Sequence, residues 1–227
     1  MNRFFMGGYW GPRKESIEQC ADRLHRFFAD LAVCDPILTT WYELGRSRKQ
    51  ALQKPAEVRD RNYLLDHLNR ERNRYDVKPR AVIEELGFNV FLWNGGDDER
   101  DAGLHIKCGL YELDMWNDVT INLPRDLGGL KQSDRMANVV AAVVRAWEPA
   151  WAGVMSDEAT DVRDYDPKFP FVDWMVYVPR RIDRVPAPSR VIPLETGSLI
   201  VVWPDPLTIS SAEALASIRR IDNLLRQ

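Results

Sequence analysis

The hydrophobic pattern of the chain begins with a strand followed by a helix. An apolar run from Phe4 to Trp10 ends at Gly11-Pro12, and a helical pattern follows from Ile17 to Leu31. Apolar side chains within that range recur every three or four residues, which places them on one face of a helix. Ser16 is a natural N-cap for this helix, and Gln19 completes a capping box. The chain therefore opens with a strand-turn-helix unit.

The middle of the chain shows the alternation of apolar and polar residues that is typical of strands. Three successive stretches alternate in this way, and turn residues such as Gly and Asn separate them. They span residues 88–93, 104–111 and 119–123. Because the connections between them are short, these stretches predict an antiparallel meander.

Further strands are predicted on both sides of this meander. A short one is expected before it at 39–44, where β-prone aromatic residues precede Gly45. The strands expected after it lie at 151–155, 174–178, 190–194 and 198–203, the last two joined by a turn at Glu195-Thr196-Gly197.

The remaining apolar patterns are helical. The most regular helix begins at Ser133-Asp134, carries apolar residues along one face as far as Trp147, and ends before Pro149. Residues 56–74 favour a helix whose narrow apolar stripe interrupts a basic surface, so we expect it on the outside of the fold. The set is completed by a single turn at 47–52, a brief apolar face at 82–86 ended by Gly87, and a C-terminal helix capped by Ser210 or Ser211.

This order of elements predicts the α+β class. The elements follow the sequence β-α-β-α-α-β-β-β-α-β-β-β-β-α, with no low-complexity linker and no internal repeat. We expect a single domain over residues 1–227, with a largely antiparallel sheet packed against several amphipathic helices. A boundary between two domains at 150–170 is the less favoured alternative.

Composition agrees with a large core inside a cytoplasmic protein. Of the 227 residues, 45% are hydrophobic and 8 are Trp, which is enough for a sizeable core. The chain has no run of 18 apolar residues, and its first residues are too short and too interrupted by glycine for a secretory signal. Cys20, Cys34 and Cys108 are an odd number without close spacing, so we expect reduced thiols.

The motifs of common enzymes are missing from the sequence. No nucleotide-binding glycine loop, nucleophile elbow, zinc-protease motif or Cys-x-x-Cys pair occurs, so no cofactor, metal or catalytic residue is predicted. His25 and His67 are expected on polar helix faces in contact with water. The enzyme alternative is a small hydrolase that uses His105 with Glu112, and it requires those two side chains to converge.

The net charge of −3 hides an uneven distribution along the chain. Residues 45–80 carry an excess of 6 positive charges, while residues 97–101 carry a net −3 and residues 157–166 a net −4. The basic region raises a nucleic-acid-binding alternative, in which its cations form one stripe. That stripe would contain Arg46, Arg48, Lys49, Arg59 and Arg61. Because these cations alternate with acids and the pI is about 5.7, we discount direct nucleic-acid binding.

The acidic segments and one tryptophan are the candidate contact residues. A short acidic run is most simply a solvated loop, but clustered carboxylates also steer a cationic partner protein and raise its association rate. Trp116 lies between Met115 and Asn117 near a turn, where it is hard to bury, so we expect an exposed contact aromatic there.

The aromatic and glycine punctuation of the chain resembles the bacterial immunity protein 52 family. The similarity is strongest near the N-terminus and continues through the later strands to cover nearly the whole chain. It is carried by Tyr9-Trp10-Gly11-Pro12-Arg13, by Cys20-Ala21-x-Arg23-Leu24, and by Trp41-Tyr42-x-x-Gly45-x-Ser47-Arg48-x-x-Ala51-Leu52.

The resemblance implies an α+β protein without catalysis of its own. Such a protein is encoded beside a polymorphic or type VI secreted toxin, and it binds and silences that toxin in the producing cell. The toxins paired with the family look like nucleases of restriction-endonuclease-like fold. A nuclease holds a polyanion in a basic cleft, so carboxylates could cover that cleft, with one aromatic as an anchor. The candidate toxin-binding residues are Asp97, Asp98, Glu99, Asp101, Trp116, Asp157, Glu158, Asp161 and Asp164.

Overall fold

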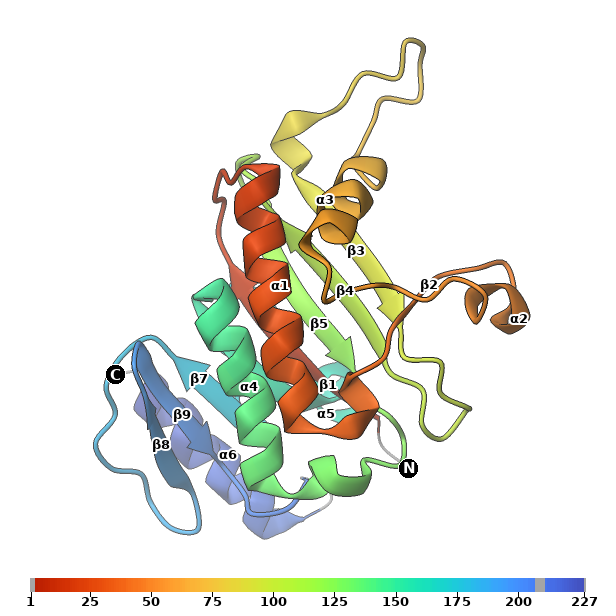
Figure 1. The fold of residues 1–227 in the computed structure, drawn as a ribbon. Coiled ribbons are helices and arrows are strands. Elements are labelled where there is room, and N and C mark those ends of the chain that lie inside the picture. Colours follow the sequence, from red (N-terminus) through yellow and green to blue (C-terminus); the bar gives the residue numbers. More distant parts are fainter. Residues whose placement is uncertain (1–2, 207–210, 227) are drawn as a thin grey trace.

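A single antiparallel sheet forms the centre of the molecule (Figure 1). The computed structural model describes residues 3–206 and 211–226. Within these ranges, 9 strands lie in the order β2-β3-β4-β5-β1-β6-β7-β9-β8, and every neighbouring pair is antiparallel. The strands are β1 (Phe4–Trp10), β2 (Tyr42–Glu43), β3 (Phe88–Trp93), β4 (Gly103–Cys108), β5 (Asn117–Asn122), β6 (Trp151–Ser156), β7 (Met175–Val178), β8 (Arg190–Leu194) and β9 (Gly197–Val201). The predicted α+β class and the meander β3-β4-β5 are confirmed.

Helices cover both faces of this sheet unequally. Helices α1, α3 and α4 lie across one face, while α5 and α6 lie behind the other half of the sheet (Figure 1). The helices are α1 (Ile17–Cys34), α2 (Arg48–Ala51), α3 (Arg61–Arg70), α4 (Ser133–Trp147), α5 (Asp157–Val162) and α6 (Ala212–Leu225). Short 3-10 turns occupy Pro36–Leu38, Glu84–Leu86 and Gly128–Lys131.

Strand β1 is the central strand of the sheet and is buried on both sides. It pairs with β5 on one edge and with β6 on the other. Met6 and Trp10 point into the core under the helices, and the Trp10 ring stacks on Trp147 at 5.4 Å. On the opposite face, the Tyr9 ring lies 4.7 Å from Trp151 in a second apolar cluster. The N-terminal segment therefore belongs to the deepest part of the fold.

Helix α1 begins with the predicted capping box and docks beside α4. The Ser16 hydroxyl accepts a hydrogen bond from the Gln19 amide at 3.3 Å, and the Gln19 side chain accepts one from the Ser16 amide at 2.8 Å. Caps of this kind stabilise a helix by about 1 kcal/mol. The Arg23 guanidinium, paired with Glu15 at 2.6 Å, donates to the Ala146 carbonyl at 2.7 Å. This bond satisfies a free carbonyl at the C-terminal end of α4 and links the two helices.

Four predictions about local structure need correction. The predicted strand at 39–44 shrinks to Tyr42–Glu43, and the helix at 56–74 shrinks to Arg61–Arg70. The acidic segment after β6, expected as a loop, contains helix α5 with Ser156 as its N-cap. His67, expected in water, is only 4% exposed: its ring stacks on Tyr63, and Arg70 donates to its Nδ1 at 2.9 Å. Burial lowers the pKa of His67, so the ring is held neutral.

Three further observations concern the cap of the last helix, the cysteines and the length of the helices. Ser211 caps helix α6 as one of the two alternatives, whereas Ser210 lies outside the described residues. Cys20, Cys34 and Cys108 are free thiols, and Cys20 and Cys108 are buried. None of the helices in the described ranges is both long and apolar enough to cross a bilayer.

Gly8 sets the distance between β1 and α4. A Cβ at this position would lie 2.7 Å from the Val143 methyl of α4 and 3.2 Å from Val119. We expect Gly8→Ala to lower the free energy of unfolding by about 1–3 kcal/mol, since a branched, buried valine has no room to move away. Urea denaturation followed by circular dichroism measures the loss. Gly11→Ala is the control, because nothing lies within 4 Å of a Cβ there, and equal stability of the two variants would contradict this role of Gly8.

Candidate functional site at the acidic end of the sheet

The sheet topology brings the two acidic segments of the sequence to the same end of the sheet. Across the central strands, Gly103 pairs with Asn122, Asn122 pairs with Phe5, and Phe4 pairs with Ser156. The loop at 97–101 leads into β4 at this end, and helix α5 leaves β6 at the same end. Two strands, β5 and β1, separate them, which corresponds to about 14 Å at the usual spacing of strands. We call this region, formed by residues 97–101 and 157–161, the acidic end.

Arg3 lies between the two acidic segments. Its guanidinium is 3.5 Å from an Asp101 carboxylate oxygen, and its carbonyl accepts a hydrogen bond from the Asp157 amide at 3.0 Å. Asp126 joins the acidic end through its amide, which donates to the Glu99 carbonyl at 2.9 Å. Partial burial, followed by the nearby Asp161 carboxylate, raises the pKa of Asp157. The segments are therefore close enough to form one negatively charged surface.

The Asn94 side chain shapes the acidic loop. Its carbonyl oxygen accepts from the amides of Gly96 and Ala102 at 3.0 and 2.8 Å, and its amide group donates to the Arg100 carbonyl at 3.0 Å. These bonds close the loop at both ends, while the side chains of residues 97–99 stay exposed. Asp98 and Glu99 form no ion pair with any described residue. Their charge is available to a partner.

A buried carboxylate supports the other acidic segment. The Asp173 carboxylate accepts hydrogen bonds from the Ser156 amide at 2.7 Å and from the Ser156 hydroxyl at 3.0 Å. The same hydroxyl caps α5 by accepting from the Ala159 amide at 3.2 Å. Asp173 is fully buried, and burial raises its pKa to about 6. Asp173 thus fixes the start of the helix that carries Asp157, Glu158 and Asp161.

Two predicted contact residues lie outside the acidic end. Trp116 precedes β5, whose first residue pairs with Trp10, so it lies at the opposite end of the sheet from the acidic loop. It is also half-buried rather than exposed, because it packs against the cluster around Tyr9 and Trp151. Asp164 is exposed on the segment that follows α5. Trp116 therefore does not lie beside the acidic segments, because strand pairing places them at the end of β5 and Trp116 precedes its start.

His105 finds a partner that the sequence did not reveal. On the face of the sheet away from α1 and α4, its Nδ1 lies 3.3 Å from an Asp118 carboxylate oxygen of β5, and its ring stacks on Phe91 of β3 at 4.4 Å. Glu112 is exposed in the loop after β4, and no hydrogen bond or ion pair links it to His105 within the described ranges. The hydrolase arrangement is not assembled. Cross-strand alternation could have indicated Asp118, but only once the register was known.

The basic residues of the nucleic-acid alternative are divided among different contacts. The Arg61 guanidinium pairs with Asp22 of α1 at 2.6 Å, and Arg48 lies over the Trp93 ring at 5.9 Å. Helix α2, which carries Arg48 and Lys49, lies at the side of the sheet and apart from α3 (Figure 1). These contacts interrupt the stripe that the sequence suggested.

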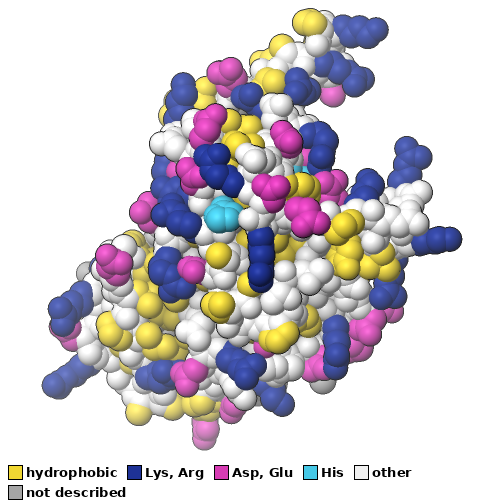
Figure 2. Space-filling view, in the orientation of Figure 1, with side chains coloured by type: hydrophobic (Ala, Val, Ile, Leu, Met, Phe, Trp, Pro, Cys, Tyr) yellow, Lys and Arg dark blue, Asp and Glu magenta, His cyan; other side chains and the backbone are white. Residues whose placement is uncertain are grey.

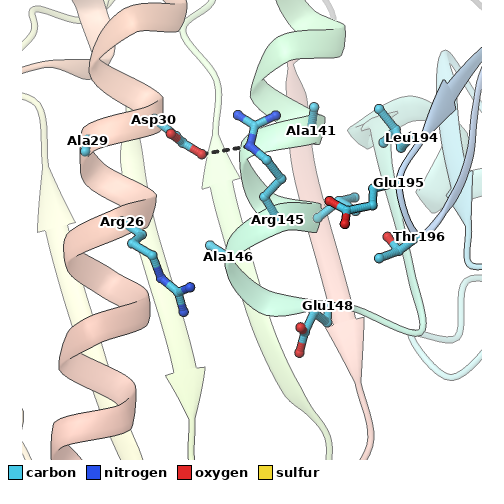
Figure 3. Close-up of a pocket in the computed structure, with 11 residues that line it drawn as sticks. Arg26, Ala29, Asp30, Ala141, Arg145, Ala146, Glu148, Leu194, Glu195 and Thr196 are labelled. Carbon is cyan, nitrogen blue, oxygen red and sulfur yellow. Dashed lines mark hydrogen bonds and ion pairs between the residues drawn. The ribbon is translucent and has the colours of Figure 1, made fainter.

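The hollow drawn in Figure 3 is distinct from the acidic end. It has a volume of about 570 Å³ and lies between α1, α4 and the β8–β9 turn, with Arg145 turned toward Asp30 at 2.9 Å. Its lining residues are Arg26, Ala29, Asp30, Ala141, Val144, Arg145, Ala146, Glu148, Leu194, Glu195 and Thr196. Both charge signs and small side chains line it, and no group of three potential metal ligands was found anywhere in the described ranges. It contains none of the predicted contact residues.

Comparison with known proteins gives a family for the chain and solved structures of similar fold. The family model described as Immunity protein 52 matches residues 2–227. Among solved structures, the "Pseudomonas aeruginosa T6SS protein PA0821" superposes with a TM-score of 0.58 at 12% sequence identity, covering 100% of this chain and 76% of the other. At this identity the likeness concerns the fold. No curated protein matches the chain.

Replacement of Asp173 provides a pH test of how the acidic helix is supported. Because the folded-state pKa of about 6 is above the ordinary value of 3.8, the folded protein binds more protons between those values, and stability falls as the pH rises through them. Asp173→Asn keeps an acceptor for Ser156 but does not titrate. We expect the stability of this variant relative to the natural chain to rise by up to about 3 kcal/mol between about pH 4 and pH 7.

Denaturant midpoints measured across this pH range give the comparison. Asp164→Asn serves as the control, since the Asp164 side chain is exposed and replacing it should change the pH dependence of stability much less. Parallel stability curves for Asp173→Asn and the natural chain would show that the carboxyl does not titrate as its burial requires.

Proposed function

Because the chain belongs to the immunity protein 52 family, we propose that it binds a toxin encoded beside it and silences that toxin in the cell that makes both. Full-length agreement with the family supports this role. The chain acts by binding, and the toxin supplies the chemistry that must be blocked. The contact between His105 and Asp118, with no converging Glu112, favours this role over the hydrolase alternative.

The toxin is proposed to be a type VI secreted nuclease of restriction-endonuclease-like fold. A protein of similar fold is described as a T6SS protein, which supports the secretion route. The nuclease activity is supported by charge. A nuclease must attract a polyanion into a basic cleft, and the same field attracts a negatively charged protein surface.

The observation that carries this proposal is the union of two acidic segments at one end of the sheet. Residues 97–101 and 157–161 are more than 50 positions apart in the sequence, yet Arg3 contacts both. Asp97, Asp98 and Glu99 are exposed, and none of them has an ion-pair partner in the described part of the chain. Facing a cationic cleft, these carboxylates would speed association and orient the complex.

A stable interface at the acidic end also needs apolar contacts. Stable complexes of this type bury roughly 800 Å² on each partner and depend on a few apolar anchors. Val162 of α5 is 66% exposed and directly follows Asp161. We propose Val162 as the apolar contact at this end, in place of Trp116.

The proposed function is tested first by co-expression with the product of the adjacent open reading frame. We expect the two proteins to co-elute in size-exclusion chromatography and the complex to degrade DNA more slowly than the neighbour alone. Separate elution, together with undiminished toxicity of the neighbour, would refute the proposed function.

Charge reversal tests the acidic end itself. We expect Asp97→Lys with Asp98→Lys to slow association with the toxin by about tenfold or more at low salt, and to flatten the salt dependence, because steering falls off with ionic screening. Stopped-flow or surface plasmon resonance measures the rate. The matched control is Asp183→Lys with Glu195→Lys, two exposed acids at the opposite end of the sheet. Equal association rates for both double variants at low salt would exclude the acidic end as the steering surface.

A further inference from the structure

A projecting arm precedes strand β3. Residues 73–83 leave the body of the protein after α3, turn back, and return to the sheet at the top of Figure 1. Hydrogen bonds within the arm hold its shape: the Tyr75 amide donates to the Ala81 carbonyl at 3.0 Å, and the Ile83 amide donates to the Asn73 carbonyl at 2.9 Å. Arg74 and Val82 form an antiparallel bridge between its two sides. The arm has its own backbone pairing, as a hairpin does.

The outer part of this arm exposes apolar side chains. All residues from 74 to 81 are exposed. Tyr75 is 52% exposed and Val77 is 73% exposed. Two apolar residues on a segment whose backbone is already paired contribute little to folding, and Tyr is among the residues that most often dominate binding energy in interfaces. Their position suits them to enter a depression in another surface.

The charge on the arm is positive and uncompensated. The arm carries three cations, Arg74, Lys78 and Arg80, and one acid, Asp76. None of these four side chains forms an ion pair within the described ranges. Cations of the neighbouring helix α3 do form ion pairs: Arg61 pairs with Asp22, and Arg70 pairs with Glu43. Figure 2 shows Lys and Arg side chains on the segment that projects at the top, with apolar side chains and an acidic side chain beside them. The arm therefore presents positive charge beside exposed apolar groups.

We infer that the projecting arm is a docking element that inserts Tyr75 and Val77 into an acidic depression on the toxin. The inference rests on the proposed function, because it takes the toxin as the partner. Complementary charge would draw the arm in, and burial of the two apolar side chains would slow dissociation. The arm thus supplies the apolar anchoring that Trp116, half-buried at the same end of the sheet, does not offer.

A protein partner suits the arm better than a nucleic acid. Affinity for a phosphate backbone comes from many cations in a row, whereas the arm offers three, interrupted by Asp76 and by apolar side chains. The acidic loop at 97–101 follows β3, just as the arm precedes it, and its carboxylates would repel phosphates. A chain with a net charge of −3 also has a weak general attraction for polyanions.

The arm and the acidic loop bracket the same side of the sheet. Phe88 pairs with Cys108 near the arm, and Trp93 pairs with Gly103 near the acidic loop. Strand β3 between them is about 20 Å long at the usual rise per residue. A partner lying along this side would meet positive charge at one end and negative charge at the other, so only one orientation would match both. One interface of ordinary size can reach both ends.

Two arm variants test the inference through binding to the product of the adjacent gene. We expect Tyr75→Ala with Val77→Ala to weaken affinity at least about tenfold, mainly through faster dissociation. We expect Arg74→Glu, Lys78→Glu and Arg80→Glu together to slow association at low salt, with the difference shrinking as salt increases. The matched control reverses three exposed arginines of the segment after β7, Arg180, Arg181 and Arg184, and should bind as the natural chain does.

The outcomes separate this inference from the proposed function. Unchanged affinity and rates for both arm variants, in a natural chain that does bind and silence the toxin, would overturn the docking role and leave the immunity function standing. Failure of the natural chain to bind the toxin would overturn both. Binding of duplex DNA by the natural chain that is lost on arm charge reversal, with toxin affinity unchanged, would assign the arm to nucleic acid instead. Equal melting temperatures confirm that the variants fold.

Discussion

The burial of strand β1 on both faces and both edges is the constraint on which the rest of the structure depends. Its two edges pair with β5 and β6. Its inner face packs against α1 and α4, and its outer face packs in the cluster of Tyr9 and Trp151. A strand in this position cannot shift by one residue without exchanging its two apolar sets. The absence of a side chain at Gly8 lets α4 approach closely, and the ion pairs of Arg23 hold α1 beside it. Every surface feature takes its place relative to this strand.

The register around β1 also explains why like charges gather at one end. Antiparallel pairing puts the start of β1 and β4 beside the end of β5 and β6, so the segments attached there become neighbours whatever their charge. Like charges held this close repel one another. Arg3 offsets part of this repulsion, and Asp173 adds a buried acid beneath helix α5. Retaining so much negative charge at one place has a physical cost that a binding role would explain.

The function proposed for this chain requires it to recognise one partner protein and inhibit it by binding. Recognition of that kind benefits from a rigid scaffold that carries exposed, charged and distinctive loops, since rigidity lowers the entropy lost on binding. The sheet supplies the scaffold, and the acidic loop and the projecting arm at the two ends of β3 supply surfaces of opposite sign. Charges of both signs also disfavour wrong partners and wrong orientations, because a mismatch brings like charges together.

The sequence by itself determined the elements whose signals are local. The capping box of Ser16 and Gln19, the alternation in β3, β4 and β5, and the apolar face of α4 all involve residues within a few positions of one another, and each predicted the observed element. The family resemblance was also readable from local motifs, and the full-length match confirms it. Only the tertiary structure decided what long-range pairing controls: the partnership of His105 with Asp118, the burial of His67, the place of Trp116, and the union of the two acidic segments. These depend on strand order and register, which are set by contacts between residues far apart in the chain, and a local pattern carries no information about such distances.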